Sequence, residues 1–119
     1  MSTLRVNTIQ NQPGTGAPSI SGLAVAWVNF NGTGTVAIRA ALSVTSITDN
    51  GTGNYAINLT NSMGSTSYAP VLGHGFANDE TGYTYGVCLP ISATQVRVNI
   101  ARDGVGEADT SWVQVAVFR

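Results

Sequence analysis

A four-residue turn sequence occurs twice in the first half of the chain and constrains the fold more than any other feature. Asn31-Gly32-Thr33-Gly34 and Asn50-Gly51-Thr52-Gly53 each separate two segments rich in alternating apolar residues. Asn-Gly is among the strongest short-range signals for a β-hairpin, because both residues tolerate a positive φ angle. The repeat therefore predicts two hairpins of similar build.

The first predicted hairpin runs from Ala24 to Ala40, and its first strand is apolar on both faces. Side chains alternate between the two faces of a strand. One face carries Ala24, Ala26, Val28 and Phe30, and the other carries Val25, Trp27 and Asn29. A strand with one face in water would carry polar residues on that face. This strand is therefore predicted to lie centrally in a sandwich or to have one face against another subunit.

The rest of the chain contains further short strands separated by turn signals. The second hairpin joins residues 44–47 to 55–59, with Tyr55, Ile57 and Leu59 on one face. Later strands are predicted at 68–72, 84–89, 95–101 and 112–118, with Pro70 favouring an edge position and Pro90 ending the strand before it. A spacing of about 8–12 residues between turn signals predicts an all-β fold, an antiparallel β-sandwich of jelly-roll type.

The last predicted strand, like the first, carries apolar residues on both faces. In one layer of a sandwich, only one face of each strand meets the core. The second face therefore needs another cover, and we predict a subunit interface around a threefold axis. The candidate interface residues are Val25, Trp27, Trp112 and Phe118.

The composition excludes several classes of function. Charged residues make up 9 % of the 119 residues, there is no lysine, and the formal net charge is −1. Such a chain has no electrostatic signal for binding nucleic acid or a membrane surface. No apolar run approaches the ~20 residues of a membrane-spanning helix, and no signal peptide is visible. Because a charge-poor surface promotes association, we expect an obligate oligomer.

The single cysteine, Cys88, is predicted to be a packing residue and not a site of chemistry. It lies in the apolar segment Tyr85-Gly86-Val87-Cys88-Leu89 and cannot form an internal disulfide. Free cysteine most often behaves as a small buried hydrophobic residue. A catalytic thiol is the alternative, and only one histidine could serve as its base.

The segment from Trp27 to Leu59, WVNFNGTGTVAIRAALSVTSITDNGTGNYAINL, resembles a module near the C-termini of bacteriophage tail-fibre and other virion structural proteins. The ending, WVQVAVFR at 112–119, is similar to the way such modules close. The resemblance covers residues 24–119 and implies a location in the virion and a homotrimer. It implies no chemistry.

Residues 1–22 differ from the remainder, and we divide the chain into this segment and a head domain at 23–119. Pro13, Gly14 and Pro18 interrupt any regular element. The apolar residues Leu4, Val6 and Ile9 are too few to form a core of their own. One interpretation is a disordered tail. The other, which we favour, is an extended attachment arm whose three apolar residues dock on other virion proteins or wind with partner chains.

The longest irregular stretch is predicted at 73–82 and is the candidate receptor-contact loop. Its candidate contact residues are His74, Asp79, Glu80, Tyr83 and Tyr85, with a second loop at 102–110. Aromatic rings at the rim of a loop can stack on sugar rings, and carboxylates can bind sugar hydroxyls. The alternative is that Tyr85 and Phe76 are core residues, since aromatic residues dominate protein cores.

Catalytic and metal-binding motifs are not found. His74 and Cys88 lie in separate stretches and do not make a metal-binding motif, so His74 is interpreted as a loop histidine. The acidic residues Asp103, Glu107 and Asp109 are interpreted as solvated loop charges. Neither a nucleophile elbow nor a phosphate-binding lysine occurs. We therefore expect no enzyme, no catalytic residue, no cofactor and no metal.

The leading hypothesis is a trimeric virion structural protein of tail-fibre type that adheres to a host surface glycan and is assembled in the host cytoplasm. Such modules usually end longer proteins, whereas here the module is nearly the whole chain. A capsid decoration protein, whose N-terminal arm clamps neighbouring shell subunits, is therefore the alternative. A glycan-degrading enzyme is the third hypothesis, because some phage tailspikes hydrolyse glycans with paired carboxylates.

Overall fold

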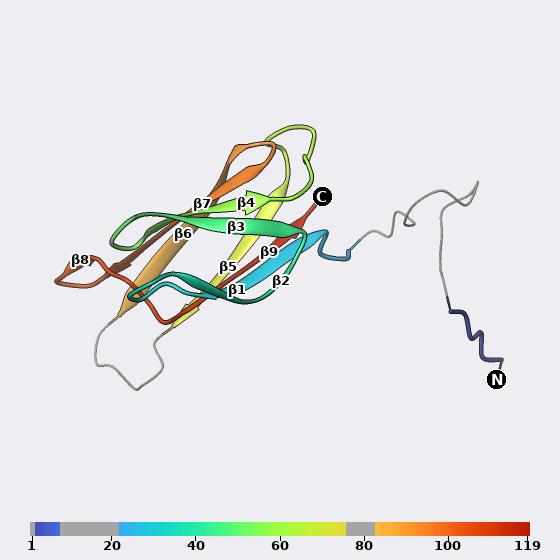
Figure 1. The fold of residues 1–119 in the computed structure, drawn as a ribbon, viewed down its shortest axis with the longest axis horizontal. Coiled ribbons are helices and arrows are strands. Elements are labelled where there is room, and N and C mark those ends of the chain that lie inside the picture. The colour runs from blue at the N-terminus through green and yellow to red at the C-terminus, as the bar shows by residue number, and fades with distance from the viewer. Residues whose placement is uncertain (1, 8–21, 76–82) are drawn as a thin grey trace.

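The computed structural model describes residues 2–7, 22–75 and 83–119, and every regular element within these ranges is a β-strand. The strands are β1 (Ala26–Asn31), β2 (Ala37–Leu42), β3 (Val44–Gly51), β4 (Asn54–Leu59), β5 (Ala69–Gly75), β6 (Thr84–Ser92), β7 (Gln95–Arg102), β8 (Gly106–Glu107) and β9 (Trp112–Phe118). They form two antiparallel sheets, seen as two layers in Figure 1. An all-β fold with two antiparallel sheets is thereby confirmed. The described part of the chain holds no helix able to cross a membrane.

Sheet A has the strand order β2-β1-β9-β5, and sheet B has the order β3-β4-β7-β6, with β8 paired to the end of β7. Three neighbouring pairs, β1–β2, β3–β4 and β6–β7, are consecutive along the chain. The pairs β1–β9 and β4–β7 instead join distant segments. The two sheets therefore combine local hairpins with long-range pairs.

Both Asn-Gly-Thr-Gly sequences connect paired strands, as predicted. The first joins β1 to β2, and the second joins β3 to β4. The last glycine of each sequence has the same backbone conformation, with φ of 61° at Gly34 and 66° at Gly53. Only glycine adopts this left-handed conformation without a steric cost. The two turns share this last glycine conformation but differ before it, because Gly51 has a φ of 127° and belongs to β3, whereas Gly32 follows the end of β1.

The core lies between the sheets and follows the period-2 pattern of the strands. Its fully buried members include Phe30 from β1 and Tyr55 from β4, whose rings meet edge to face at a centroid distance of 5.3 Å. The remaining inward residues come from β1, β4, β7 and β9: Ala26, Val28, Ile57, Leu59, Val96, Val98, Ile100, Val113, Val115 and Val117. The predicted inward faces of all four strands are confirmed.

Three local predictions are corrected. Pro90 does not end a strand, because β6 continues to Ser92 with an irregular register after Pro90. β6 is an edge strand of sheet B, where a missing backbone N–H is tolerated. His74 does not lie in a loop, because β5 extends to Gly75. The glycine-rich segment at 102–109 is not wholly irregular, because Gly106 and Glu107 pair with β7.

Candidate interaction surfaces

The outer face of sheet A is apolar over most of its extent. We define it by the residues that alternate with the buried positions of its strands: Trp27, Asn29, Ala40, Leu42, Val71, Gly73, Trp112, Gln114, Ala116 and Phe118. Large apolar side chains stand exposed here, with relative exposures of 38 % for Trp27, 47 % for Leu42 and 57 % for Val71. An apolar patch of this kind on a protein surface marks an interaction site.

A groove of about 470 Å³ crosses this face. Trp27 of β1 and Val71 of β5 are both in register with Ala116 of β9, which lies between them. One step along the strands, Gln114 lies between Asn29 and Gly73. Ala116 thus forms a low floor between the larger apolar side chains of Trp27 and Val71, while the Gln114 side chain lies beside Gly73, and all six residues line the groove.

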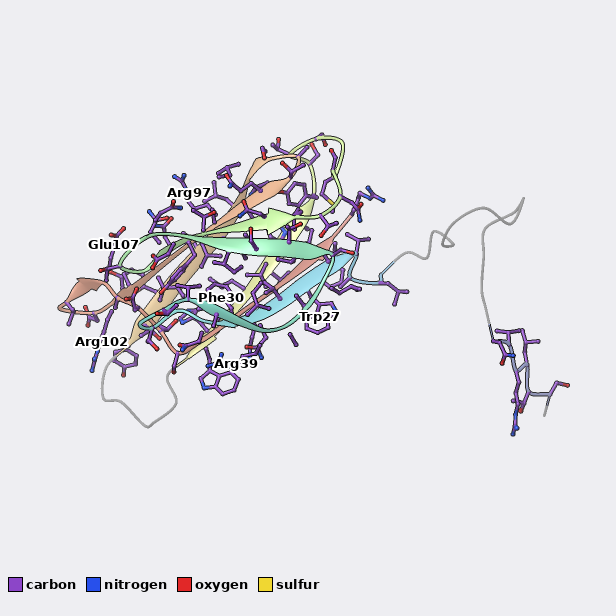
Figure 2. The ribbon with its side chains drawn as sticks, in the orientation of Figure 1. Trp27, Phe30, Arg39, Arg97, Arg102 and Glu107 are labelled. Atoms are coloured by element: carbon purple, nitrogen blue, oxygen red, sulfur yellow. The ribbon has the colours of Figure 1, made fainter. Side chains whose placement is uncertain are left out.

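Arg39 of β2 places a cation over this face, and that cation is already engaged. Its guanidinium lies 3.9 Å from the centroid of the Trp112 ring, and its Nη2 donates to the carbonyl of Ser111 at 2.6 Å. Its Nη1 donates to Asn29 Oδ1 at 3.3 Å. Figure 2 shows Arg39 and Trp27 on the same outer side of the molecule. The guanidinium is therefore held against the face by one ring and two neutral acceptors.

The outer face of sheet B is polar over β3, β4 and β7, where its side chains hydrogen-bond to one another, and apolar along the edge strand β6. Asn58 of β4 donates to Ser46 Oγ and Thr48 Oγ1 on β3, both at 3.0 Å, and accepts from Gln95 Nε2 on β7 at 2.8 Å. Arg97 and Glu107 lie on this side, opposite Trp27 (Figure 2). This row of amide and hydroxyl groups joins three strands.

A stripe of exposed side chains runs along β6 at the edge of sheet B. Tyr83 just before the strand is 83 % exposed, and Tyr85 and Val87 within it are 60 % and 57 % exposed. The alternative prediction that Tyr85 is a core residue is therefore wrong, because the alternation of β6 turns Tyr85 outward and Cys88 inward. Leu89 continues the stripe opposite Arg97. These residues could stack on a planar or sugar-like ligand.

His74 faces the interior at the edge where β5 meets β6. Its ring lies against Gly86, where an added Cβ would be 3.0 Å from the imidazole, and its Nδ1 is buried without a hydrogen-bond partner. Nearby, Cys88 Sγ donates to the Pro70 carbonyl at 3.4 Å, and burial raises the pKa of the thiol. Cys88 is half-buried and packs against the core, as predicted. No group of three or more metal-ligating side chains occurs among the described residues.

The Asp109 carboxylate connects the two glycine turns, the second turn directly and the first through the Tyr55 hydroxyl. The sequence pattern did not indicate this role. Asp109 Oδ1 accepts from the Gly53 amide at 2.8 Å and from the Tyr55 hydroxyl at 2.9 Å. The Tyr55 hydroxyl is also 2.8 Å from the Gly32 carbonyl, and the Gly32 amide donates to the Thr110 carbonyl at 2.9 Å. A Cβ at Gly32 would lie 2.5 Å from the Tyr55 hydroxyl oxygen. Asp109 is therefore a structural residue and not a solvated loop charge.

Burial and the hydrogen bond to Asp109 raise the pKa of Tyr55. Desolvation is the larger cause, since the side chain is fully buried between the sheets. The neutral hydroxyl is thus the form that holds the two turns together.

The remaining candidate residues divide between the outer face of sheet A, the core and the N-terminal segment. Trp27, Trp112 and Phe118 share the outer face of sheet A, whereas Val25 is half-buried and packs against the core. Leu4 and Val6 are 86 % and 52 % exposed. His74 and the tyrosines of β6 do not share a face, because His74 points inward. The predictions for Asp79, Glu80, Phe76 and Ile9 lie outside the described residues.

Comparison with protein-family models, with curated proteins and with solved structures finds no match to this chain. Its function is therefore inferred from its own surfaces.

Proposed function

We propose that this chain is a bacteriophage virion structural protein of tail-fibre type, a non-enzymatic homotrimer that adheres to a host surface glycan. The outer face of sheet A carries this proposal. It presents Trp27, Leu42 and Val71 to solvent, while the cation above it is engaged within the face. A soluble protein that keeps such a face needs a cover for it, and self-association supplies one.

The exposed stripe along β6 supports the adhesive part of the proposal. Tyr83 and Tyr85 offer ring faces, and Asn99 and Glu107 offer polar groups on the neighbouring strands. Tyrosine is suited to such contacts because it supplies rigid, amphipathic area at low entropic cost. Three copies in one particle-bound trimer would raise a weak affinity by multivalency.

A second candidate function is capsid decoration, and the N-terminal segment favours it. Leu4 and Val6 are exposed apolar side chains outside the sandwich and could clamp a neighbouring shell protein. In this function the head caps the shell and β6 binds no receptor.

The test is to locate the chain on the intact particle by electron cryo-microscopy and to measure binding to host surface polysaccharide. Density at the tail or its fibres, with binding lost in Tyr85→Ala, is expected for the adhesive function. Density on the shell, with no polysaccharide binding, would replace adhesion by decoration. Release of reducing sugar ends from the polysaccharide would overturn the non-enzymatic part.

A further inference from the structure

We propose that the groove on the outer face of sheet A seats residues 2–7 of a second copy of this chain. The inference rests on the proposed function, because it names one contact that holds the proposed trimer together. In this contact, the exposed apolar side chains of the N-terminal segment would cover the exposed apolar side chains around the groove.

The groove is shaped for an extended segment that lies along β9. Its walls, Trp27 and Val71, lie on the strands either side of β9 and are thus about 10 Å apart at the strand spacing of ~4.8 Å. Its floor is Ala116, and one step along β9 the Gln114 side chain lies over Gly73. These two positions on β9 are about 7 Å apart, which is two residues of an extended chain.

The N-terminal segment has the matching pattern. Leu4 and Val6 are separated by one residue, so in an extended chain they point to the same side about 7 Å apart. Both are exposed, at 86 % and 52 %, and therefore lack a cover within their own chain. Arg5 would point away from the groove into solvent, which suits a face whose defining residues include no carboxylate. The exposed amide of Gln114 can hydrogen-bond the backbone of the docked segment.

Docking onto the face is favoured over addition of a strand to the edge of β5. That edge is turned toward sheet B, where the Pro70 carbonyl accepts from Cys88 and Gly86 approaches Leu72. Proline also removes a donor that an added strand would need. The side chains of Leu4 and Val6, and not a ladder of backbone hydrogen bonds, would then supply the affinity.

The size of the face argues for a second copy as the source of the segment. Four strands about 4.8 Å apart and about 20 Å long present a flat area of roughly 400 Å², half of the ~800 Å² that each partner buries in a standard interface. If the segment docked on its own chain, it would cover the groove and leave less of the face to contact another subunit. If it docks on a second copy, the contact between segment and groove is itself part of the interface between subunits. Residues 8–21 could extend to at most about 50 Å, which is long enough to reach a neighbour.

Cross-linking between two tagged chains tests the proposal. Both chains carry Cys88→Ser, which keeps a hydrogen-bond donor to Pro70. One chain carries Leu4→Cys, the other carries Val71→Cys, and they are co-expressed and treated with a short bis-maleimide. We expect a cross-linked heterodimer, because a segment docked on the face lies about 10 Å from the strands below it, within reach of this reagent and beyond the reach of a disulfide. The matched control, Arg5→Cys in place of Leu4→Cys, is expected to cross-link at least fivefold less.

Two results would overturn the inference. One is a cross-link that forms only within a chain that carries both cysteines, because the segment would then occupy its own groove. The other is equal cross-linking of the position 4 and position 5 variants, or none of either.

Deletion of residues 2–7 separates this inference from the proposed function. We expect at least a tenfold rise in the dissociation constant of the trimer, measured by sedimentation equilibrium. A deletion variant that associates as tightly as the full chain would overturn the proposed contact and leave the trimer intact. A full chain that is monomeric at micromolar concentration would overturn both.

Discussion

The two outer faces of the sandwich differ in the side chains that they present to solvent. Sheet B covers its outer side over β3, β4 and β7 with a row of hydrogen bonds centred on Asn58, and exposes Tyr85 and Val87 along its edge strand β6. Sheet A exposes Trp27 and Val71 around a groove and leaves its apolar side chains without a cover. Both sheets contribute buried residues to the same core, so the stability of one subunit does not require the difference. The exposed apolar side chains are therefore explained by what lies outside the subunit, and the hydrogen-bonded row by the subunit itself.

Trp27→Asp is expected to have the largest effect, because it places an unpaired charge in the proposed interface. The subunit should stay folded, since Trp27 does not reach the core, while the association constant falls by roughly a hundredfold or more. Sedimentation equilibrium and circular dichroism measure the two properties separately. Val87→Asp on sheet B is the control and should leave the trimer intact. A trimeric Trp27→Asp protein would refute the assignment of this face.

Tyr55→Phe changes a side chain in the core between the two sheets. It should lower the free energy of unfolding without changing the oligomeric state. The variant loses the hydroxyl contacts to Asp109 and the Gly32 carbonyl. Leaving these acceptors unpaired is expected to cost about 2–3 kcal/mol in the free energy of unfolding. Urea denaturation below and above the trimer dissociation constant measures it. A large shift in oligomeric state would show that the faces and the turns are coupled.

The raised pKa of Tyr55 also predicts how stability depends on pH. Above the ordinary tyrosine pKa of about 10, the unfolded chain loses this proton and the folded chain keeps it. The contribution of Tyr55 to the free energy of unfolding should therefore be constant below pH ~10 and fall as pH rises further, by up to about 1.4 kcal/mol per pH unit. Tyr68, whose pKa burial also raises, should add to the fall. Tyr55→Phe should remove the Tyr55 share, and an unchanged slope would contradict this assignment.

Asn58→Ala removes the centre of the hydrogen-bonded row on sheet B and should have a smaller effect. Two exposed and one part-buried side-chain hydrogen bonds are lost, and water replaces each of them in part. We expect a loss of about 1–2 kcal/mol in unfolding free energy, measured by thermal denaturation, with no change in trimer mass. A change in trimer mass would mean that the polar face also contacts a partner.

Arg39→Ala should have the smallest effect, and it tests how much one contact on the outer face of sheet A contributes to subunit stability. The substitution removes the guanidinium over the Trp112 ring and its bond to the Ser111 carbonyl. Exposed cation–π contacts are worth about 0.5–1 kcal/mol. We expect a loss of that size in subunit stability by urea denaturation, with Arg39→Lys intermediate. A loss above about 2 kcal/mol would show that the pair is desolvated by a partner.

The sequence predicted the strands and their inward faces, because the period-2 pattern of a residue such as Val98 is local information. It also predicted both hairpins, because Asn-Gly specifies its turn within four residues. The role of Asp109 could not be predicted, since it depends on sheet packing that brings residues 32, 53 and 109 together. His74 was misplaced because flanking glycines usually indicate a loop. The outward position of Tyr85 required the register of β6, which aromatic content alone does not give.

The position of β9 has a consequence for how the protein is made. β9 lies between β1 and β5 in sheet A, yet it is the last of the three strands to be synthesised. Until Phe118 has left the ribosome, β1 and β5 have no common neighbour and the groove of sheet A has no floor. Non-local pairing of this kind is slow to form. A nascent chain therefore cannot offer this docking surface to a finished one.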